Sequence, residues 1–376
     1  MYAGIAGLRT HMQNLNVIGN NVANVNTYGY KSARSVFKTS LYTSLNGGSD
    51  GTDTLGGINP SQIGYGSTMT NVDIDMSTGN YNVTGSSTDM MIDGDGFFLV
   101  GDKTIANNFD GSARDVNTLK SLTLTRVGDF DFAADGYLAN NDGNCVYGFL
   151  CIGFNEATGK PIFSDQLVPI RYPRIETTTT GTPPVTSTHV KYPTIPENGG
   201  HLTDAQPEDE DATEPLKQAT FSAITVDKNT GIITATCNDT NELVTIGMIA
   251  VGLVKNPNGV TNLGDNYYQA GEGSGGLSIA TLGGAAQSNG ITHVNSSLAA
   301  GNQTGGAAAD DTQIPDGLRI LSGGKTRVLT NGLEMSKTDL AQEISQMILT
   351  QRGYQANTRI VTVTDSMLEE LVNMKR

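Results

Sequence analysis

The fold is decided by the two ends of the chain, and the first of them reads GIAGLRTHMQNLNVIGNNVANVNT over residues 4–27. Apolar side chains recur there every three or four residues, which is the spacing of one stripe along an α-helix. The stripe consists of Ile5, Leu8, Met12, Leu15, Ile18 and Val22. The opposite face is rich in Asn and almost free of charge, and Asn can be buried at lower cost than an ion when its hydrogen bonds are met. We therefore expect this helix to be surrounded by protein on most sides.

The other end predicts a second, longer helix, from residue 337 to about residue 372. Its apolar residues repeat largely at heptad spacing, which is typical of helices that pack along their length. The members are Leu340, Ile344, Met347, Tyr354, Val361 and Leu368. Ser336 and Asp339 resemble a capping box at its start, and Gly353 is its weak point and a candidate for a bend.

Neither apolar stripe can be covered by its own helix, which leaves two alternatives. The two helices pair within one chain as a helical hairpin, or they also pack against other copies. The uncharged polar face of the first helix favours assembly with other copies. Candidate assembly residues are therefore the two stripes, together with the polar residues Asn20, Asn21, Asn24 and Thr27.

The middle of the chain predicts short β-strands separated by Gly, Asn and Asp turns. The expected fold class is α+β and multi-domain, with paired coiled-coil-like terminal helices and nested all-β domains, sandwich-like or barrel-like, inserted between them. The expected domains are a terminal helical domain (1–30 with 333–376), an extended connecting segment (31–75), an inner β domain (76–150 with 243–332) and an outer β domain (151–242). Within them, 176–215 is expected to be loop-rich, and 271–312 to be a long flexible insertion.

Composition excludes several classes of protein. The 376 residues carry a net charge of −15, whereas general nucleic-acid binding needs a cationic surface. No apolar run reaches the ~18–20 residues of a membrane span, so no membrane insertion is expected. We see no cleavable secretory signal at the N-terminus. The three cysteines, Cys145, Cys151 and Cys237, are too few for a disulfide framework and are expected to be buried free thiols.

Motifs that carry chemistry are missing from the sequence. The GGKT run at 323–326 lacks the earlier glycine of a phosphate-binding loop, because position 319 is Arg. The four histidines are scattered and show no zinc-ligand spacing. We expect no catalytic residue, no cofactor and no metal site, although distant residues could still meet in the fold.

Both ends carry motifs in addition to their periodicity. They occupy residues 4–8, 20–27, 29–31, 331–334, 339–340, 351–357 and 371–376, and internal motifs lie at 92–98, 125–130, 135–138, 256–260 and 264–267. Together these motifs resemble those of the bacterial flagellar rod and hook proteins over about residues 1–150 and 245–376.

The resemblance implies a structural protein that leaves the cell through the flagellar type III export apparatus without a cleaved signal. It implies self-assembly into a helical tube of the flagellum, with paired terminal helices lining the channel. The implied partners are other copies of the chain, rod proteins, a hook cap and hook–filament junction proteins. Within the family, rod proteins are typically shorter and lack an added outer domain. The roughly ninety residues between Cys151 and Leu243 could form such a domain, so the resemblance favours a subunit of the curved, torque-transmitting hook. A distal-rod or related basal-body subunit is the first alternative, and a secreted enzyme or adhesin is the alternative from another class.

Overall fold

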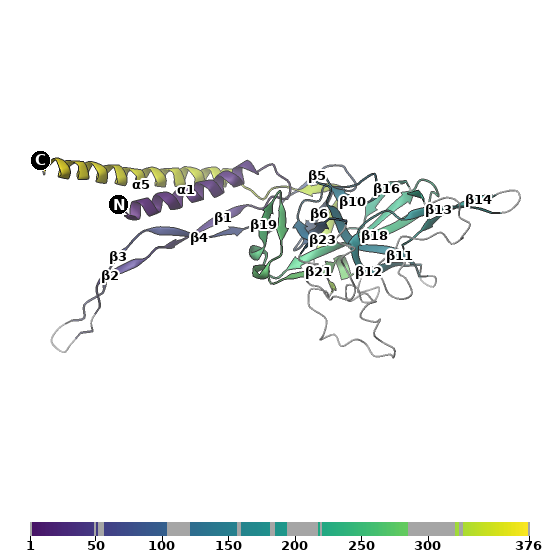
Figure 1. Ribbon diagram of the computed structural model, residues 1–376, viewed down its shortest axis with the longest axis horizontal. Coiled ribbons are helices and arrows are strands. Elements are labelled where there is room, and N and C mark those ends of the chain that lie inside the picture. Colours follow the sequence, from purple (N-terminus) through teal and green to yellow (C-terminus); the bar gives the residue numbers. More distant parts are fainter. Residues whose placement is uncertain are drawn as a thin grey trace. The chain divides into compact units, whose positions relative to one another are not determined.

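The computed structural model describes residues 2–48, 50–51, 56–103, 121–155, 159–180, 185–193, 217–218, 220–284, 320–322 and 326–374. The chain forms two compact units (Figure 1). The terminal unit combines Met1–Met76 with Ser336–Arg376, and the β unit is Ser77–Met335.

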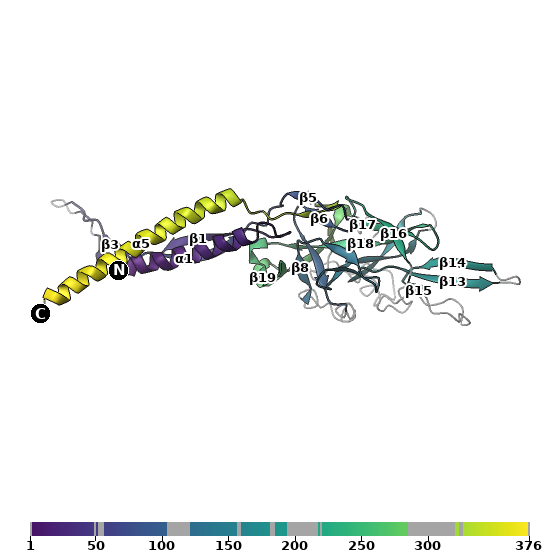
Figure 2. The ribbon, with the colours of Figure 1, turned by 90° about the horizontal axis from the view of Figure 1, so that it is seen from above.

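Two antiparallel helices dominate the terminal unit (Figure 2). Helix α1 spans Tyr2–Ala23 and helix α5 spans Leu340–Met374, which confirms the two terminal helices expected from the sequence. Helix α5 begins at residue 340 because Asp339 caps it: Asp339 Oδ1 accepts the N–H groups of Ala341 and Gln342. The capping box expected from Ser336 is therefore wrong, and Ser336 Oγ accepts the Thr338 N–H instead.

The segment expected to be an extended connection is built from two antiparallel strand pairs. Strand β1 (Ala33–Thr39) pairs with β4 (Ser67–Ile74), and β2 (Tyr42–Asn46) pairs with β3 (Ser61–Gly64). We call these four strands the ribbon. The ribbon is tied to α1 where Thr10 Oγ1 donates a hydrogen bond to the Ser67 carbonyl.

The β unit contains a sheet of 13 strands among the described residues. Its main path runs β16-β17-β18-β11-β7-β8-β20-β19, and β9, β10, β12, β21 and β22 branch from it. The two long strands, β11 (Cys145–Phe154) and β18 (Leu243–Val254), lie side by side in its middle. The other members are β7 (Phe97–Gly101), β8 (Thr123–Thr125), β9 (Phe130–Phe132), β10 (Leu138–Asn140), β12 (Pro161–Pro169), β16 (Phe221–Val226), β17 (Ile232–Cys237), β19 (Thr261–Gly264), β20 (Tyr267–Gln269), β21 (Leu277–Thr281) and β22 (Ile320–Ser322).

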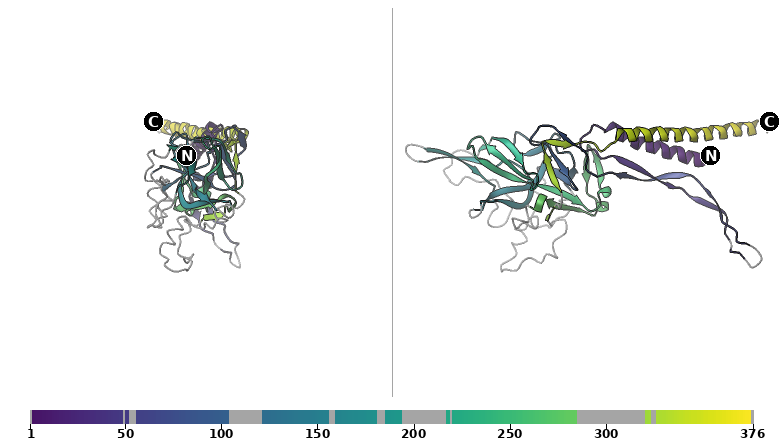
Figure 3. Two further views of the ribbon diagram at one scale, coloured as in Figure 1. Left: turned by 90° about the vertical axis from the view of Figure 1, so that its right-hand side faces the viewer. Right: turned by 180° about the vertical axis from the view of Figure 1, so that it is seen from behind.

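Smaller sheets complete the β unit, as seen from behind in Figure 3. Strand β5 (Tyr81–Val83) pairs with β24 (Gly332–Glu334), and β6 (Met90–Asp93) pairs with β23 (Arg327–Thr330). Strands β13 (Arg174–Thr180), β14 (Val185–Lys191) and β15 (Lys217–Gln218) form a third sheet. Among the residues of this unit that the structure describes, short 3₁₀ turns occur at Pro257–Gly259, Glu272–Ser274 and Leu282–Gly284.

One expectation for this unit is corrected by the β13–β14 hairpin. Within the stretch 176–215 that was expected to be loop-rich, residues 176–180 and 185–191 are strand, and seven residue pairs are in register from Arg174–Lys191 to Thr180–Val185. Residues 181–184 and 194–215 lie outside the described residues. Four consecutive threonines, 177–180, lie in β13, and β-branched residues favour strands. Most of the insertion expected at 271–312 lies outside the described residues, but 277–281 forms β21 in the large sheet.

The larger apolar cluster of the β unit draws on residues from both predicted β domains, and a smaller cluster contains Ile175, Cys237 and Val244. The buried members of the larger cluster are Met90, Ile92, Phe98, Val100, Phe130, Leu138, Val146, Ile170, Val226, Ile233, Ala235, Ile246, Ile249, Val251, Leu282 and Val328. Cys145, Cys151 and Cys237 are buried and free, which confirms the expected thiols. An ion pair is buried as well. The side chains of Arg126 and Glu334 are 2% and 1% exposed, and the N···O distance between them is 3.7 Å.

Candidate assembly surface

The face on which α1 meets α5 consists mainly of glycines and polar side chains. An added Cβ at Gly7 would lie 2.7 Å from Asn357 Nδ2, and one at Gly353 would lie 2.8 Å from the ring of His11. Such distances are shorter than real Cβ contacts, so a side chain at either position would require Asn357 or His11 to shift. Helix α5 continues without interruption through Gly353, which lies against His11, and the bend expected there stays a prediction.

Hydrogen bonds between side chains fix the register of the two helices. Asn14 Nδ2 donates to Thr350 Oγ1 over 2.9 Å, and Asn21 Nδ2 donates to Glu343 Oε1 over 2.9 Å. On α1, Gly7, Asn14 and Asn21 recur every seven residues, so they form one stripe along the helix. The Asn-rich face of α1 is thus in part the contact with α5, as its lack of charge predicted.

Asn21 joins three elements and is 1% exposed. Its Oδ1 accepts the Ala33 N–H and the Tyr30 hydroxyl, and its Nδ2 also donates to the Ala33 carbonyl. One amide therefore links α1, the start of β1 and the first turn of α5. Buried polar groups need such complete satisfaction, because an unpaired one costs free energy.

Electrostatics at this junction disfavour an ionised Glu343. Desolvation raises the pKa of its carboxyl above the ordinary value, although the Asn21 hydrogen bond opposes the shift, and Asp339 raises it further. Its second oxygen, Oε2, is buried without a hydrogen-bond partner among the described residues. Burial, and then Glu343, also raise the pKa of Tyr30.

The predicted apolar stripe of α1 lies beside the contact face, roughly a quarter turn away at 100° per residue. Ile18 alone of the stripe is buried, at 2% exposed. Leu8, Leu15 and Val22 are half-buried. Ile5 is 49% and Met12 is 50% exposed. Of the polar candidates, Asn20 is exposed, while Asn24 and Thr27 are half-buried.

The stripe of α5 is more exposed than that of α1. Ile344 is 44% exposed, and Leu340, Tyr354 and Leu368 are also exposed, whereas Met347 and Val361 are half-buried. The two apolar stripes therefore do not cover each other, because the helices meet through glycine, amide and hydroxyl groups instead. Pairing within one chain leaves the apolar stripes open.

Further apolar side chains are exposed on the same unit. On α5 they include Leu349, Val363, Met367, Leu371 and Val372. On the ribbon and the segments that connect its strands, Leu41 is 77% and Leu45 is 60% exposed, and Tyr42, Ile58 and Ile63 are exposed as well. Two-stranded hairpins are marginally stable in water without a packed face. The terminal unit thus presents apolar surface on both its helices and its ribbon.

The sequence did not reveal which face of α1 meets α5. An apolar stripe usually marks the packed face, so Gly7, His11, Asn14, Thr350, Gly353 and Asn357 were missed. The available signal was the glycines: a helix-interior glycine costs about 1 kcal/mol relative to alanine, and close packing offsets that cost.

Among the described residues, no group of three or more His, Cys, Asp or Glu side chains is placed to hold a metal ion. No helix of the described chain has the length and apolar content needed to cross a bilayer.

These features define a class of protein: a subunit with a β body inserted between two terminal segments that pair as helices and keep apolar faces exposed. Comparison with known proteins shows what the two ends of the chain are similar to. A model of flagella basal body rod proteins matches residues 1–31, and a model of the C-terminal region of flagellar basal body rod FlgEFG proteins matches residues 330–374. The matched ranges contain α1 and α5.

Relatives match over the full length of the chain. The flagellar basal-body rod protein FlgG of Bacillus subtilis (strain 168) is 29% identical over 100% of this chain and 98% of its own length. The flagellar hook protein FlgE of Borreliella burgdorferi is 25% identical over 100% of this chain and 99% of its own length, and that of Treponema pallidum is similar to the same extent. The chain is thus similar over its full length to flagellar rod and hook proteins.

Proposed function

We propose that this protein is a structural subunit of the bacterial flagellar hook and assembles with copies of itself into a curved tube that transmits torque from rod to filament. The observation that carries the proposal is the exposed apolar surface of α1 and α5, which remains after the helices have paired. Full-length similarity to FlgE hook proteins supports the same function.

The proposed assembly residues on α1 are the predicted stripe, Ile5, Leu8, Met12, Leu15, Ile18 and Val22, with Asn20, Asn21, Asn24 and Thr27 holding the local structure. On α5 they are Leu340, Ile344, Met347, Tyr354, Val361 and Leu368. Six of these apolar residues are exposed, so they are available to a neighbouring copy. Burying a large apolar side chain contributes about 1.5–3 kcal/mol, and a helical polymer repeats that gain at every subunit.

In this proposal the terminal helices form the inner layer of the tube, and the β domains form outer layers. The nested arrangement has an inner domain (76–150 with 243–332) and an outer domain (151–242). Strands of both ranges share the large sheet, so the two β layers would move as one body. The exposed ribbon supplies further apolar contacts between copies.

The proposed location is the flagellar hook and basal body outside the cell, reached through the flagellar type III export apparatus without a cleaved signal. The proposed partners besides other copies are rod proteins, a hook cap and hook–filament junction proteins. The proposed role is structural and not enzymatic, in keeping with a family of structural subunits.

A rod subunit is the second candidate. It is favoured by the Bacillus subtilis FlgG relative, whose length is matched almost completely without a large insertion. Electron microscopy of the purified, polymerised protein separates the two: curved tubes support the hook, and straight tubes support the rod. Failure to form any tube would contradict both.

A substitution tests the assembly surface directly. We expect Ile344→Asp to abolish polymerisation and leave the β unit folded, because an unpaired buried ion costs several kcal/mol. Sedimentation followed by electron microscopy measures the polymer, and circular dichroism checks the fold. Gln351→Asp is the matched control, because it adds the same charge at an exposed polar position of the same helix. Intact tubes from Ile344→Asp would refute the assignment.

A further inference from the structure

Two charged side chains are fully buried among the described residues of the β unit: Arg126, which follows strand β8, and Glu334, which ends strand β24. We call them the buried pair. Taking two ions out of water costs free energy, and replacing such a pair by apolar residues is often neutral or stabilising. Removing one partner is costly, because the other charge is then left buried and unpaired. The buried pair therefore resists separation more than it stabilises the fold.

Arg126 is held from several sides. Its Nη1 donates to the Ile92 carbonyl over 3.3 Å, and its Nη2 donates to the Gly94 carbonyl over 2.9 Å. The guanidinium carbon lies 5.4 Å from the centre of the Phe97 ring, which is close enough for a cation–π interaction. Desolvation lowers the pKa of Arg126, and the charge of Glu334 opposes that shift. One side chain thus joins the end of β6, strand β7 and strand β24.

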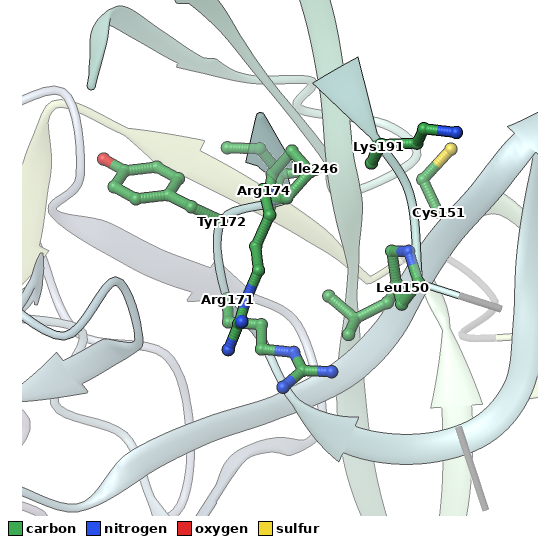
Figure 4. A pocket seen from close by; sticks show the side chains of 9 residues that line it. Leu150, Cys151, Arg171, Tyr172, Arg174, Lys191 and Ile246 are labelled. Carbon is green, nitrogen blue, oxygen red and sulfur yellow. The ribbon is translucent and has the colours of Figure 1, made fainter. Parts of the chain in front are cut away.

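Other cations of this unit keep contact with solvent. Arg171, Arg174 and Lys191 line a pocket whose empty space is about 280 Å³, including the part open to solvent. Arg174 is exposed, and Arg171 and Lys191 are half-buried. Figure 4 shows the side chains of Arg174 and Lys191 extending apart, and each of the three cations also interacts within the chain. Their charges are therefore shared between solvent and internal partners, whereas Arg126 takes its opposite charge mainly from Glu334.

Glu334 ties together the two places where the chain leaves the β unit. The chain passes between the units at Met76–Ser77 and again at Met335–Ser336, and we call these two places the crossings. The Oε1 atom of Glu334 accepts the Gly79 N–H over 2.6 Å. A Cβ added at Gly79 would collide with the Met335 carbonyl. Residues next to the two crossings are therefore in direct contact, and the carboxylate that joins them is the one that pairs with the buried arginine.

The crossings are also held on the side of the terminal unit. The Asp75 N–H donates to the Ser32 carbonyl over 2.9 Å, and the Lys337 N–H donates to the Tyr30 carbonyl over 3.3 Å. The two acceptors are close neighbours in sequence, so one short segment anchors both crossings within that unit. The link from each anchor to the buried pair is only a few residues long, and so short a chain has little slack.

We propose that the buried pair is a clamp that holds both crossings and passes force between the terminal helices and the large sheet. The inference deepens the proposed function and rests on it, since a subunit that transmits torque needs a firm connection between its two units. Arg126 directly follows β8 of the large sheet, so a pull on β24 reaches that sheet through the pair. Opening the clamp would leave the Arg126 charge buried and unpaired, which makes opening unfavourable.

The test removes one charge of the buried pair from the full-length protein. Glu334→Gln keeps an acceptor for the Gly79 N–H and loses the ion pair. Asp135→Asn is the matched control, because it removes a carboxylate charge from an exposed ion pair with Lys103 in the same unit. If Glu334→Gln does not fold, Arg126→Met with Glu334→Leu takes its place, since this double variant leaves no buried ion without its partner.

Two measurements follow the crossings. The first is hydrogen–deuterium exchange of the soluble subunit, which compares the amides of 77–83 and 332–335 with those of β11 and β18. In Glu334→Gln we expect exchange at 77–83 and 332–335 to speed up about tenfold more than in β11 and β18, because these segments then open without breaking a charged contact. The second is electron microscopy of tubes, in which the variant should show a wider spread of curvature than wild type. Asp135→Asn should change neither.

Exchange at the crossings that is no faster than in Asp135→Asn would overturn the clamp and leave the proposed function standing. An equal increase in β11 and β18 would also overturn it, because the pair would then stabilise the whole β unit and not the crossings. Faster exchange with an unchanged spread of curvature would overturn the mechanical role. Absence of any tube from the wild-type protein would overturn the proposed function, whereas exchange of the soluble subunit would still decide whether the pair holds the crossings.

Discussion

At the scale of single residues, the terminal unit is organised by amides and glycines. Asn21 satisfies groups on three elements, and Gly7 and Gly353 allow the helices to touch. The Asn-rich composition of α1 predicted that protein surrounds the helix on most sides; the structure buries Asn21 and half-buries Asn14, whereas Asn16 and Asn20 are exposed. A buried amide can both donate and accept hydrogen bonds.

Removal of the Asn21 amide tests its linking role. We expect Asn21→Ala to destabilise the terminal unit by about 2–4 kcal/mol, because buried groups of Ala33 and Tyr30 lose their partner. Urea denaturation followed by helical circular dichroism measures the change. Asn16→Ala, at an exposed position of the same helix, should change stability by less than about 0.5 kcal/mol. Equal effects of the two substitutions would contradict the role.

Substitutions at two glycines of α1 distinguish the effect of helix packing from that of helix propensity. Gly7→Ala should weaken the α1–α5 contact despite alanine's better propensity, because the new Cβ meets Asn357. Gly19→Ala meets no atom within 4 Å and should stabilise α1 by up to about 1 kcal/mol. Thermal unfolding of the helices in both variants gives the comparison. Stabilisation by Gly7→Ala would show that the helices do not approach as described.

The raised pKa of Glu343 makes the terminal unit sensitive to pH. Because the folded carboxyl holds its proton more tightly than the unfolded one, its contribution is most favourable below the unfolded value of about 4.5 and is lost as pH rises through the raised value. Glu343→Gln keeps an acceptor for Asn21 and cannot ionise. Its stability advantage over wild type should therefore grow between about pH 4 and pH 7 in pH-dependent unfolding experiments. An advantage that shrinks as pH rises would reverse the sign of the argument.

At the scale of elements, the sequence predicted both terminal helices, the turn-separated strands and the buried thiols, because each follows from local periodicity or composition. It did not predict the α1–α5 face, because apolar spacing outweighed the glycines. It also missed the pairing within 31–75 and the β13–β14 hairpin, because threonine-rich and polar strands carry little alternation of hydrophobicity. The sharing of one sheet by both predicted β ranges depends on pairings distant in sequence, which periodicity does not encode.

That shared sheet predicts the effect of removing residues 155–240. The deletion takes away β12 and β17, the neighbours of β11 and β18, together with buried Ile233 and Ala235 of the core. We expect the β unit to lose its cooperative unfolding transition and become sensitive to protease. A shorter change, replacing 178–187 with an Asn-Gly turn, removes only the distal β13–β14 hairpin and should leave the transition intact. Cooperative unfolding of the larger deletion would show that the two β ranges fold independently.

At the scale of the whole molecule, charge and apolar exposure are divided between the units. The terminal unit has nine acidic and nine basic residues and many exposed apolar side chains, whereas the β unit carries the entire negative charge. Neutral apolar surfaces associate, and like-charged surfaces resist tight association. This division suits a polymer with a firm helical layer and weaker contacts between β units.

The most direct measurement is hydrogen–deuterium exchange of the full-length protein before and after polymerisation. If the exposed faces of α1 and α5 become buried between copies, amides of 2–23 and 340–374 will exchange much more slowly in the polymer, while those of β11 and β18 will hardly change. Helices that are equally protected in the soluble subunit and in the polymer would contradict the account, since no new burial of the terminal unit would then accompany assembly.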